Sequence, residues 1–160
     1  MKKILVTGAA GFIGASLSKK LILQGFEVIG IDNLNDYYNV GLKKDRLEDI
    51  KNIEKSSNGK FHLFVFSIDE ITKLDEIFSK YEPEIVINLA AQAGVRHSLI
   101  DPHQYVQSNL VGFHNIIFLS KKYKISNFIY ASSSSVYGGN TNMPFNESQS
   151  VDHPVSFYAA

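Results

Sequence analysis

Short apolar runs alternate with amphipathic segments along the whole chain. The apolar runs predict strands over Lys3–Thr7, Glu27–Ile31, Phe61–Phe66, Ile85–Ala90 and Asn127–Ala131. These runs are apolar at nearly every position, so both faces of each strand are expected to be buried. Burial on both faces is typical of a parallel sheet that is covered by helices.

The segments between these runs carry apolar residues at helical spacing, as Ile13, Leu17 and Leu21 do. Helices are predicted over residues 11–24, 42–55, 70–80 and about 102–123. Asp101 and Pro102 begin the last helix, because they have the form of an N-cap followed by proline at the first helical position. The alternation of strands and helices predicts one doubly wound α/β domain over residues 1–160.

Composition narrows the function classes. The chain has 160 residues, 44% of them apolar, which is enough for one domain with a core. The 16 basic and 16 acidic residues balance, so no nucleic-acid partner is expected. No segment has the length and apolarity of a membrane-spanning helix, so we expect no membrane association and a cytoplasmic protein. Cysteine is absent, which excludes thiol chemistry and disulfides.

The stretch VTGAAGFIG places Gly8, Gly11 and Gly14 between the first predicted strand and the first predicted helix. Glycines also suit a tight turn with no ligand, so the spacing alone leaves both interpretations open. Its position favours an anion site, because the free N–H groups of a helix N-terminus bind phosphate. Asp32 ends the second predicted strand, where a carboxylate can accept hydrogen bonds from ribose hydroxyls. A carboxylate there repels a 2′-phosphate, so NAD is expected rather than NADP.

Four longer stretches carry a family resemblance. They are DNLNDYYNVGLKKDRL (32–47), NLAAQAGVRHSL (88–99), SNLVGFHNI (108–116) and YASSSSVYGGNTNMPF (130–145). Together with the glycine spacing, they resemble the extended short-chain dehydrogenase/reductase family. Within that family they resemble the nucleotide-sugar epimerases, and most closely the UDP-glucuronate 4-epimerases.

The resemblance implies a Rossmann-like NAD-binding domain, a UDP-sugar substrate and a homodimeric parent protein. It also implies a set of cofactor-binding residues, which come from the glycine loop, from the strand ends and from the helix after residue 101. They are Gly8, Gly11, Phe12, Ile13, Gly14, Asp32, Asn33, Asn35, Ser67, Ile68, Leu89, Ala90, Ala91, Gln92, Ser108 and Tyr158.

The same resemblance implies the catalytic residues. Ser133 would hydrogen-bond the sugar O4, with Ser134 and Ser135 beside the substrate carboxylate. Tyr158 would be the base that takes the proton from the O4 hydroxyl while hydride leaves C4 for NAD. An ordinary tyrosine is a poor base at neutral pH, because its pKa is about 10. In the family, a lysine four residues later lowers that pKa.

That lysine would stand at position 162, whereas the last residue of the chain is Ala160. We therefore expect the chain to be the N-terminal part of an epimerase, with the sugar-nucleotide-binding lobe absent and no activity of its own. The last predicted helix places Val106, Leu110, Phe113 and Ile117 on one face. In the family such helices usually form the dimer interface, so this face is expected to be left uncovered.

Some positions depart from the family pattern. Ser67 stands where an aspartate usually contacts the adenine amino group, and His97 stands where related epimerases often carry tyrosine. Arg96 could be a ligand for a phosphate or could brace its loop. Tyr37 and Tyr38 are interpreted as loop packing. The other histidines have no metal-ligand spacing, so no metal site is expected.

Two other functions stay open. A nucleotide-sugar 4,6-dehydratase is similar in sequence but needs Asp and Glu directly after the active-site hydroxyl. Those positions are Ser134 and Ser135 here, and serine cannot do that work. A non-catalytic dinucleotide-binding module is the third alternative. It is disfavoured for the parent protein because Ser133 and Tyr158 keep the spacing of the catalytic pair.

Overall fold

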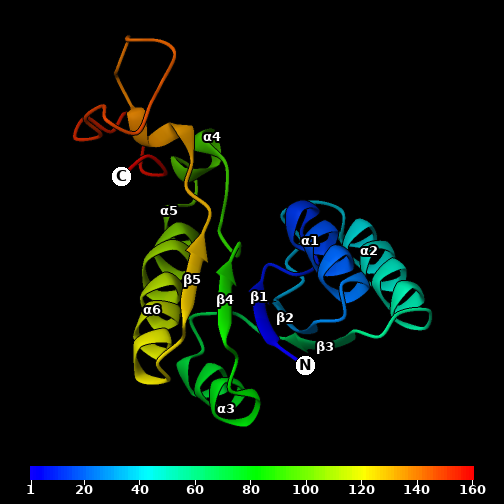
Figure 1. Ribbon diagram of the computed structural model, residues 1–160. Helices are drawn as coiled ribbons and strands as arrows, with labels where there is room; N and C mark the ends of the chain where they lie inside the picture. Colours follow the sequence, from blue (N-terminus) through cyan, green and yellow to red (C-terminus); the bar gives the residue numbers. More distant parts are fainter.

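A parallel sheet runs through the centre of the molecule in the computed structural model, which describes residues 1–160. Its five strands lie in the order β3-β2-β1-β4-β5 (Figure 1). They are β1 (Lys3–Thr7), β2 (Glu27–Asp32), β3 (Lys60–Val65), β4 (Ile85–Asn88) and β5 (Asn127–Tyr130). Every neighbouring pair is parallel. The prediction of a doubly wound parallel sheet is confirmed.

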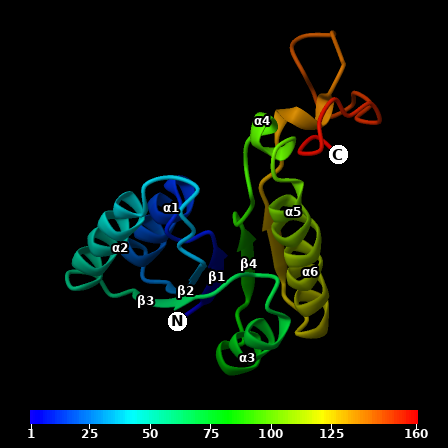
Figure 2. The ribbon, with the colours of Figure 1, turned by 180° about the vertical axis from the view of Figure 1, so that it is seen from behind.

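Helices cover both faces of this sheet. Helices α1 (Phe12–Leu23) and α2 (Val40–Glu54) lie together on one face. Helices α3 (Ile71–Tyr81) and α6 (Phe113–Lys122) lie on the other, as the front and back views agree (Figures 1 and 2).

Strand β1 divides the core because successive side chains point to opposite faces of a strand. Ile4 and Val6 join the cluster under α1 and α2. Leu5 joins the cluster under α3 and α6, with Ile116 and Leu119 of α6. All five side chains are at most 3% exposed, so the central strand is buried on both faces as its apolar run predicted.

Helix α2 begins two residues before its predicted start. The side chain of Asn39 accepts a hydrogen bond from the N–H of Gly41 at 2.8 Å and so caps the helix. Val40 and Gly41 do not extend the apolar face of this helix, so apolar spacing alone predicts a later start.

The predicted helix over 102–123 is divided. A turn of α-helix, α5 (Pro102–Tyr105), leads into a wider π-helical segment, η1 (Val106–Gly112), and then into α6. Gly112 lies against Ile68, where an added Cβ would stand 2.5 Å from the Ile68 side chain. Asp101 is the residue before α5, but its side chain makes no capping hydrogen bond. A short helix, α4 (Val95–Ser98), was not predicted.

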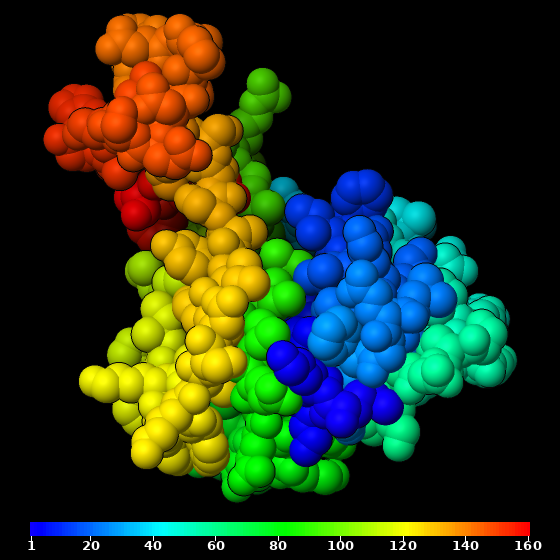
Figure 3. All heavy atoms as spheres, in the orientation of Figure 1, coloured from blue at the N-terminus to red at the C-terminus, as the bar shows by residue number.

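The face predicted to stay uncovered on the last helix is exposed in part. Leu110 is 60% exposed and Ile117 44%, whereas Val106 and Phe113 are half-buried. Strand β5 is one of the two edge strands of the sheet, and its Ile129 and Tyr130 are 46% and 56% exposed. The residues after β5, coloured orange to red, project beyond the carboxyl end of the sheet (Figures 1 and 3).

Candidate functional site

The glycine loop joins β1 to α1 and depends on two close backbone approaches. Gly8 has φ +68°, and a Cβ there would stand 2.9 Å from the backbone of Leu89 and Ala90. A Cβ on Gly14 would stand 2.0 Å from the carbonyl oxygen of Gly8. Gly11 precedes α1, and no side chain caps that helix. The N–H groups of the first turn are therefore available to an anionic ligand.

A cavity of about 200 Å³ opens beside this loop, at the carboxyl ends of β1, β2 and β4. Strand β1 has β2 on one side and β4 on the other, so this is the switch point of the sheet, where ligands bind in doubly wound folds. Most of the expected cofactor residues line it. They are Gly8, Gly11, Asp32, Asn33, Asn35, Ser67, Ile68, Leu89, Ala90, Ala91, Gln92 and Ser108.

Four residues of the expected cofactor set lie outside this cavity. Phe12 and Ile13 point to solvent, at 77% and 62% exposed, so only their backbone N–H groups could face a phosphate. Gly14 keeps the loop close to α1. Tyr158 lies at a second cavity, described below.

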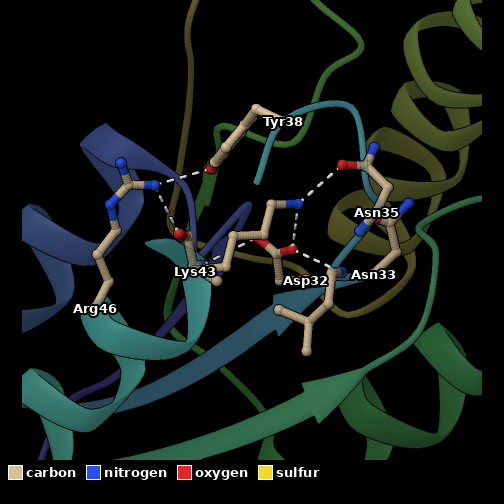
Figure 4. A network of polar contacts seen from close by, with 8 residues as sticks. Asp32, Asn33, Asn35, Tyr38, Lys43 and Arg46 are labelled. Carbon is tan, nitrogen blue, oxygen red and sulfur yellow. Dashed lines mark hydrogen bonds and ion pairs between the residues drawn. The ribbon is translucent and has the colours of Figure 1, made fainter. Parts of the chain in front are cut away.

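Asp32 is the centre of a polar network at the end of β2 (Figure 4). Its carboxylate accepts hydrogen bonds from the backbone N–H groups of Ala10 at 3.0 Å and Leu34 at 2.9 Å. The ammonium of Lys43 lies 3.3 Å from the same carboxylate and donates to Asn35 at 2.9 Å. Asp32 is 6% exposed and Lys43 5%, so the pair is buried.

Sequence reasoning missed further residues of this cavity. Lys43 lines it, and so do Tyr37 and Tyr38, whose sequence context predicts loop packing only. Ile31, Phe66 and Ala93 complete the lining. A lysine on an amphipathic helix usually faces solvent, so the sequence carried no signal for a buried one.

Thr7 and Asn88 join the two strands that flank the switch point. The Thr7 hydroxyl donates to the Asn88 side chain at 2.7 Å. It also accepts from the N–H groups of Leu89 and Ala90, at 3.1 and 3.0 Å. These hydrogen bonds hold the loop after β4 against the glycine loop. In the sequence, the only indication of them is that β1 and β4 each end with a polar residue.

Gln92 lies in the same loop and is only 2% exposed. Its backbone N–H and carbonyl pair with the side chain of Asn109, at 2.8 and 2.9 Å. Its side-chain nitrogen Nε2 is buried and has no hydrogen-bond partner in the chain. A buried donor without a partner is costly, so its place in the cavity wall points to a ligand that accepts from it.

A second cavity, of about 500 Å³, adjoins the first, and Ala90 and Ala91 line both. Ser133 and Tyr158 line this second cavity together. The hydroxyl oxygen of Ser133 accepts from the N–H of Ser135 at 3.2 Å, just before a short 3₁₀ turn over Ser134–Tyr137.

Two serines of the expected substrate set are not brought into either cavity. Ser134 and Ser135 enter the 3₁₀ turn, and Ser132 lines the second cavity instead. The turn begins directly after Ser133, so Ser134 and Ser135 are its first two residues. Their contact with the substrate carboxylate stays a prediction.

Tyr105 is a buried residue in the wall of the second cavity. Its one hydroxyl proton is shared between the carbonyl oxygens of Ala93 and Gly94, at 2.8 and 2.6 Å, and its ring meets that of Tyr158 edge-on at 5.9 Å. Burial raises the pKa of Tyr105, and the nearby Tyr37 raises it further. Tyr105 therefore stays protonated and continues to donate. The backbone N–H of Tyr158 donates to Ser98 at 3.2 Å.

No group of three or more His, Cys, Asp or Glu side chains is placed to hold a metal ion. His97 packs between the rings of Tyr37 and Tyr105. None of the helices is both long enough and apolar enough to span a membrane.

Comparison with known proteins defines the class. The family model described as GDP-mannose 4,6 dehydratase matches residues 5–160. The chain therefore belongs to that family.

Two named relatives are longer than this chain. Protein CapI of Staphylococcus aureus is 53% identical over 99% of this chain and 46% of its own length. A UDP-glucuronate 4-epimerase of Thermodesulfobacterium geofontis is 46% identical over 98% of the chain and 46% of its own length. The chain thus spans about half the length of the curated relatives it matches.

Solved structures agree with this fold. A UDP-glucose 4-epimerase of Thermotoga maritima, crystallised with UDP-glucose, is 34% identical and superposes with a TM-score of 0.81, over 98% of this chain and 46% of its own. A UDP-glucose 4-epimerase of Thermus thermophilus, crystallised with NAD, is 28% identical with a TM-score of 0.77, over 98% and 46%. The Rossmann-like fold is confirmed.

Proposed function

We propose that this chain binds NAD and forms the catalytic NAD-binding part of a nucleotide-sugar 4-epimerase that acts on UDP-glucuronate and UDP-galacturonate. The observation that carries the proposal is the pair of adjoining cavities. One has the glycine loop and Asp32, and the other has Ser133 and Tyr158. Relatives that are 42–46% identical and named UDP-glucuronate 4-epimerases support the choice of substrate.

The residues of the first cavity fit NAD. The first turn of α1 would hold the pyrophosphate, Asp32 would bind the adenosine ribose, and Ile68 would lie beside the adenine. The unpaired side-chain nitrogen of Gln92 fits a ligand with acceptor groups. When bound, NAD would supply a hydride acceptor that later returns the hydride to the sugar.

The second cavity supplies the proton chemistry. The hydroxyl oxygen of Ser133 already accepts the N–H of Ser135, so its own proton is left to donate to the sugar O4. Tyr158 would take the proton from that O4 hydroxyl and return it after the sugar turns over. Ser133 and Tyr158 line the same cavity, so one sugar O4 bound there could contact both side chains.

A 4,6-dehydratase is the second candidate, because the family model carries that name. Elimination of water needs an acid and a base after the active-site hydroxyl, whereas Ser134 and Ser135 are neutral. They also lie outside both cavities. Their positions and the names of the relatives favour the epimerase. A module that only binds dinucleotide would not need Ser133 and Tyr158 to share a cavity.

The test uses a chimera in which residues 1–160 are followed by the C-terminal part of the Thermodesulfobacterium geofontis relative. Ser133→Ala and Tyr158→Phe should each lower turnover at least about 100-fold, because each removes a group that acts on the O4 proton. The NAD affinity should change little. Tyr137→Phe is the matched control, because that ring stacks on Phe145 outside the cavity, at 4.5 Å. Near-normal turnover in either active-site variant would refute its role.

We also propose that the parent protein is a homodimer and that the 160-residue chain alone is inactive. Exposed apolar side chains on the last helix support association there, among them Leu110, Ile117 and Phe118. Light scattering after size exclusion should find self-association of the chain, and Leu110→Glu should weaken it. A monodisperse monomer that epimerises UDP-glucuronate would contradict both statements.

A further inference from the structure

Lys43 is a buried cation in the wall of the first cavity. Its side chain is 6% exposed, as is that of Asp32, and the two are 3.3 Å apart. Its ammonium also lies 2.9 Å from Asn35 and 5.3 Å from the centre of the Tyr38 ring. Burying an ammonium costs free energy, and lysine is almost never fully buried unless it is paired. The contacts of Lys43 must offset this cost, because its position in a helix does not.

Three hydrogen bonds already occupy most of the lone pairs of the Asp32 carboxylate. One carboxylate oxygen accepts from both Leu34 and Lys43, and the other accepts from Ala10. Each oxygen offers about two lone-pair sites, so one site is left for a ligand. A ribose presents two hydroxyls, and Asp32 can therefore accept only one of them.

Lys43 offers the missing partner. An ammonium has three protons, and two of those of Lys43 are engaged, one by Asp32 and one by Asn35. The third is left for the cavity, whose wall includes Lys43. A ribose hydroxyl oxygen there can accept from Lys43 while the neighbouring hydroxyl donates to Asp32.

We propose that Lys43 is a specificity-determining residue for the cofactor, because it donates to a ribose hydroxyl and offsets the charge of Asp32. The proposal rests on NAD binding at this cavity. A lone carboxylate would repel a 2′-phosphate strongly, whereas the Asp32–Lys43 pair has no net charge. Arg46 adds a second cation to the same network, through Tyr38 and the carbonyl of Ala10. Lys43 thus narrows the preference for NAD over NADP that Asp32 alone would impose.

The experiment measures the dissociation constants of NAD and NADP by calorimetry. Lys43→Met should weaken NAD about tenfold, through one lost charge-assisted hydrogen bond. It should weaken NADP about 100-fold, because the remaining carboxylate then repels the phosphate. The ratio of the NADP constant to the NAD constant should therefore rise about tenfold. Lys44→Met, with the same charge change on the exposed side of α2, should leave the ratio unchanged.

Lys43→Met leaves the buried carboxylate of Asp32 without its ion-pair partner, which could disturb the local structure. A double variant controls for this effect. Asp32→Asn combined with Lys43→Met leaves no charge in the pair, so the ratio should return to the wild-type value or fall below it. The inference is overturned if Lys43→Met and Lys44→Met give the same ratio, or if the double variant keeps the raised one. A wild-type chain that binds neither nucleotide would instead overturn the proposed function, and this inference with it.

Discussion

Replacing Gly14 with alanine should strain the glycine loop, because the new methyl group would meet backbone atoms. The added Cβ would stand 2.0 Å from the carbonyl oxygen of Gly8 and 2.8 Å from its carbonyl carbon. Neither atom belongs to a flexible side chain, so α1 or the loop must move. Overpacking of this kind costs about 1–3 kcal/mol, and we expect about 3 kcal/mol here.

The size of the thermal shift follows from the size of the chain. Unfolding entropy is about 2.1 cal/mol/K per residue, or roughly 0.34 kcal/mol/K for 160 residues. A loss of about 3 kcal/mol should therefore lower Tm by roughly 9 °C. NAD affinity should fall at least about tenfold, because the N–H groups at the start of α1 would no longer converge on one phosphate.

Differential scanning calorimetry measures Tm, and isothermal titration calorimetry measures the affinity for NAD. Gly139→Ala is the matched control, since the nearest atom to its new methyl would be 3.8 Å away. That variant should leave both quantities close to wild type. If Gly14→Ala lowered Tm by less than about 3 °C and kept the NAD affinity, the close approach of loop and helix would not matter as argued.

Three further predictions concern stability and selectivity. Wild type should prefer NAD to NADP and Asp32→Ala should lose that preference in calorimetric titrations; equal wild-type affinities would contradict this. Thr7→Val should lower the free energy of unfolding by about 3 kcal/mol in urea denaturation, because it breaks the three hydrogen bonds of the buried Thr7 hydroxyl, and a change below about 1 kcal/mol would contradict it. Hydrogen bonds from Lys122 and Tyr123 hold the pKa of Asp75 below its usual range. The Tm difference between wild type and Asp75→Asn should therefore be full above about pH 4 and vanish as pH falls further, and a constant difference would refute it.

The strands and the glycine loop could be predicted because their signals are local. Five apolar runs of strand length determined the elements, and a glycine at φ +68° suits a tight turn. Asp32 could be placed because a polar residue directly after a buried strand lies at the carboxyl edge of the sheet. The sheet order then follows from the rules of doubly wound folds.

The π-helical segment could not be predicted, because it depends on contacts between distant residues. Gly112 packs on Ile68, and Asn109 pairs with the backbone of Gln92. Apolar spacing continues through the segment without a break, so the pattern predicted one regular helix. Wider turns of this kind often occur at functional sites, and this one brings Ser108 to the first cavity.

Lys43 could not be identified from the sequence for a similar reason. A lysine in an amphipathic helix carries no mark of burial until its partner is known, and here the partner is at the end of β2. Ser134 and Ser135 have the same chemistry as Ser133, and only the 3₁₀ turn separates them from the second cavity.

The most direct test of the central claim is product analysis of the chimera by proton NMR. UDP-glucuronate and UDP-glucose are supplied separately, with NAD and without added reductant. The account predicts that UDP-glucuronate is converted to a mixture with its 4-epimer UDP-galacturonate, that UDP-glucose reacts far more slowly, and that no water is lost from either. A 4-keto-6-deoxy sugar as the accumulated product, or no conversion by a folded protein that binds NAD, would contradict the account.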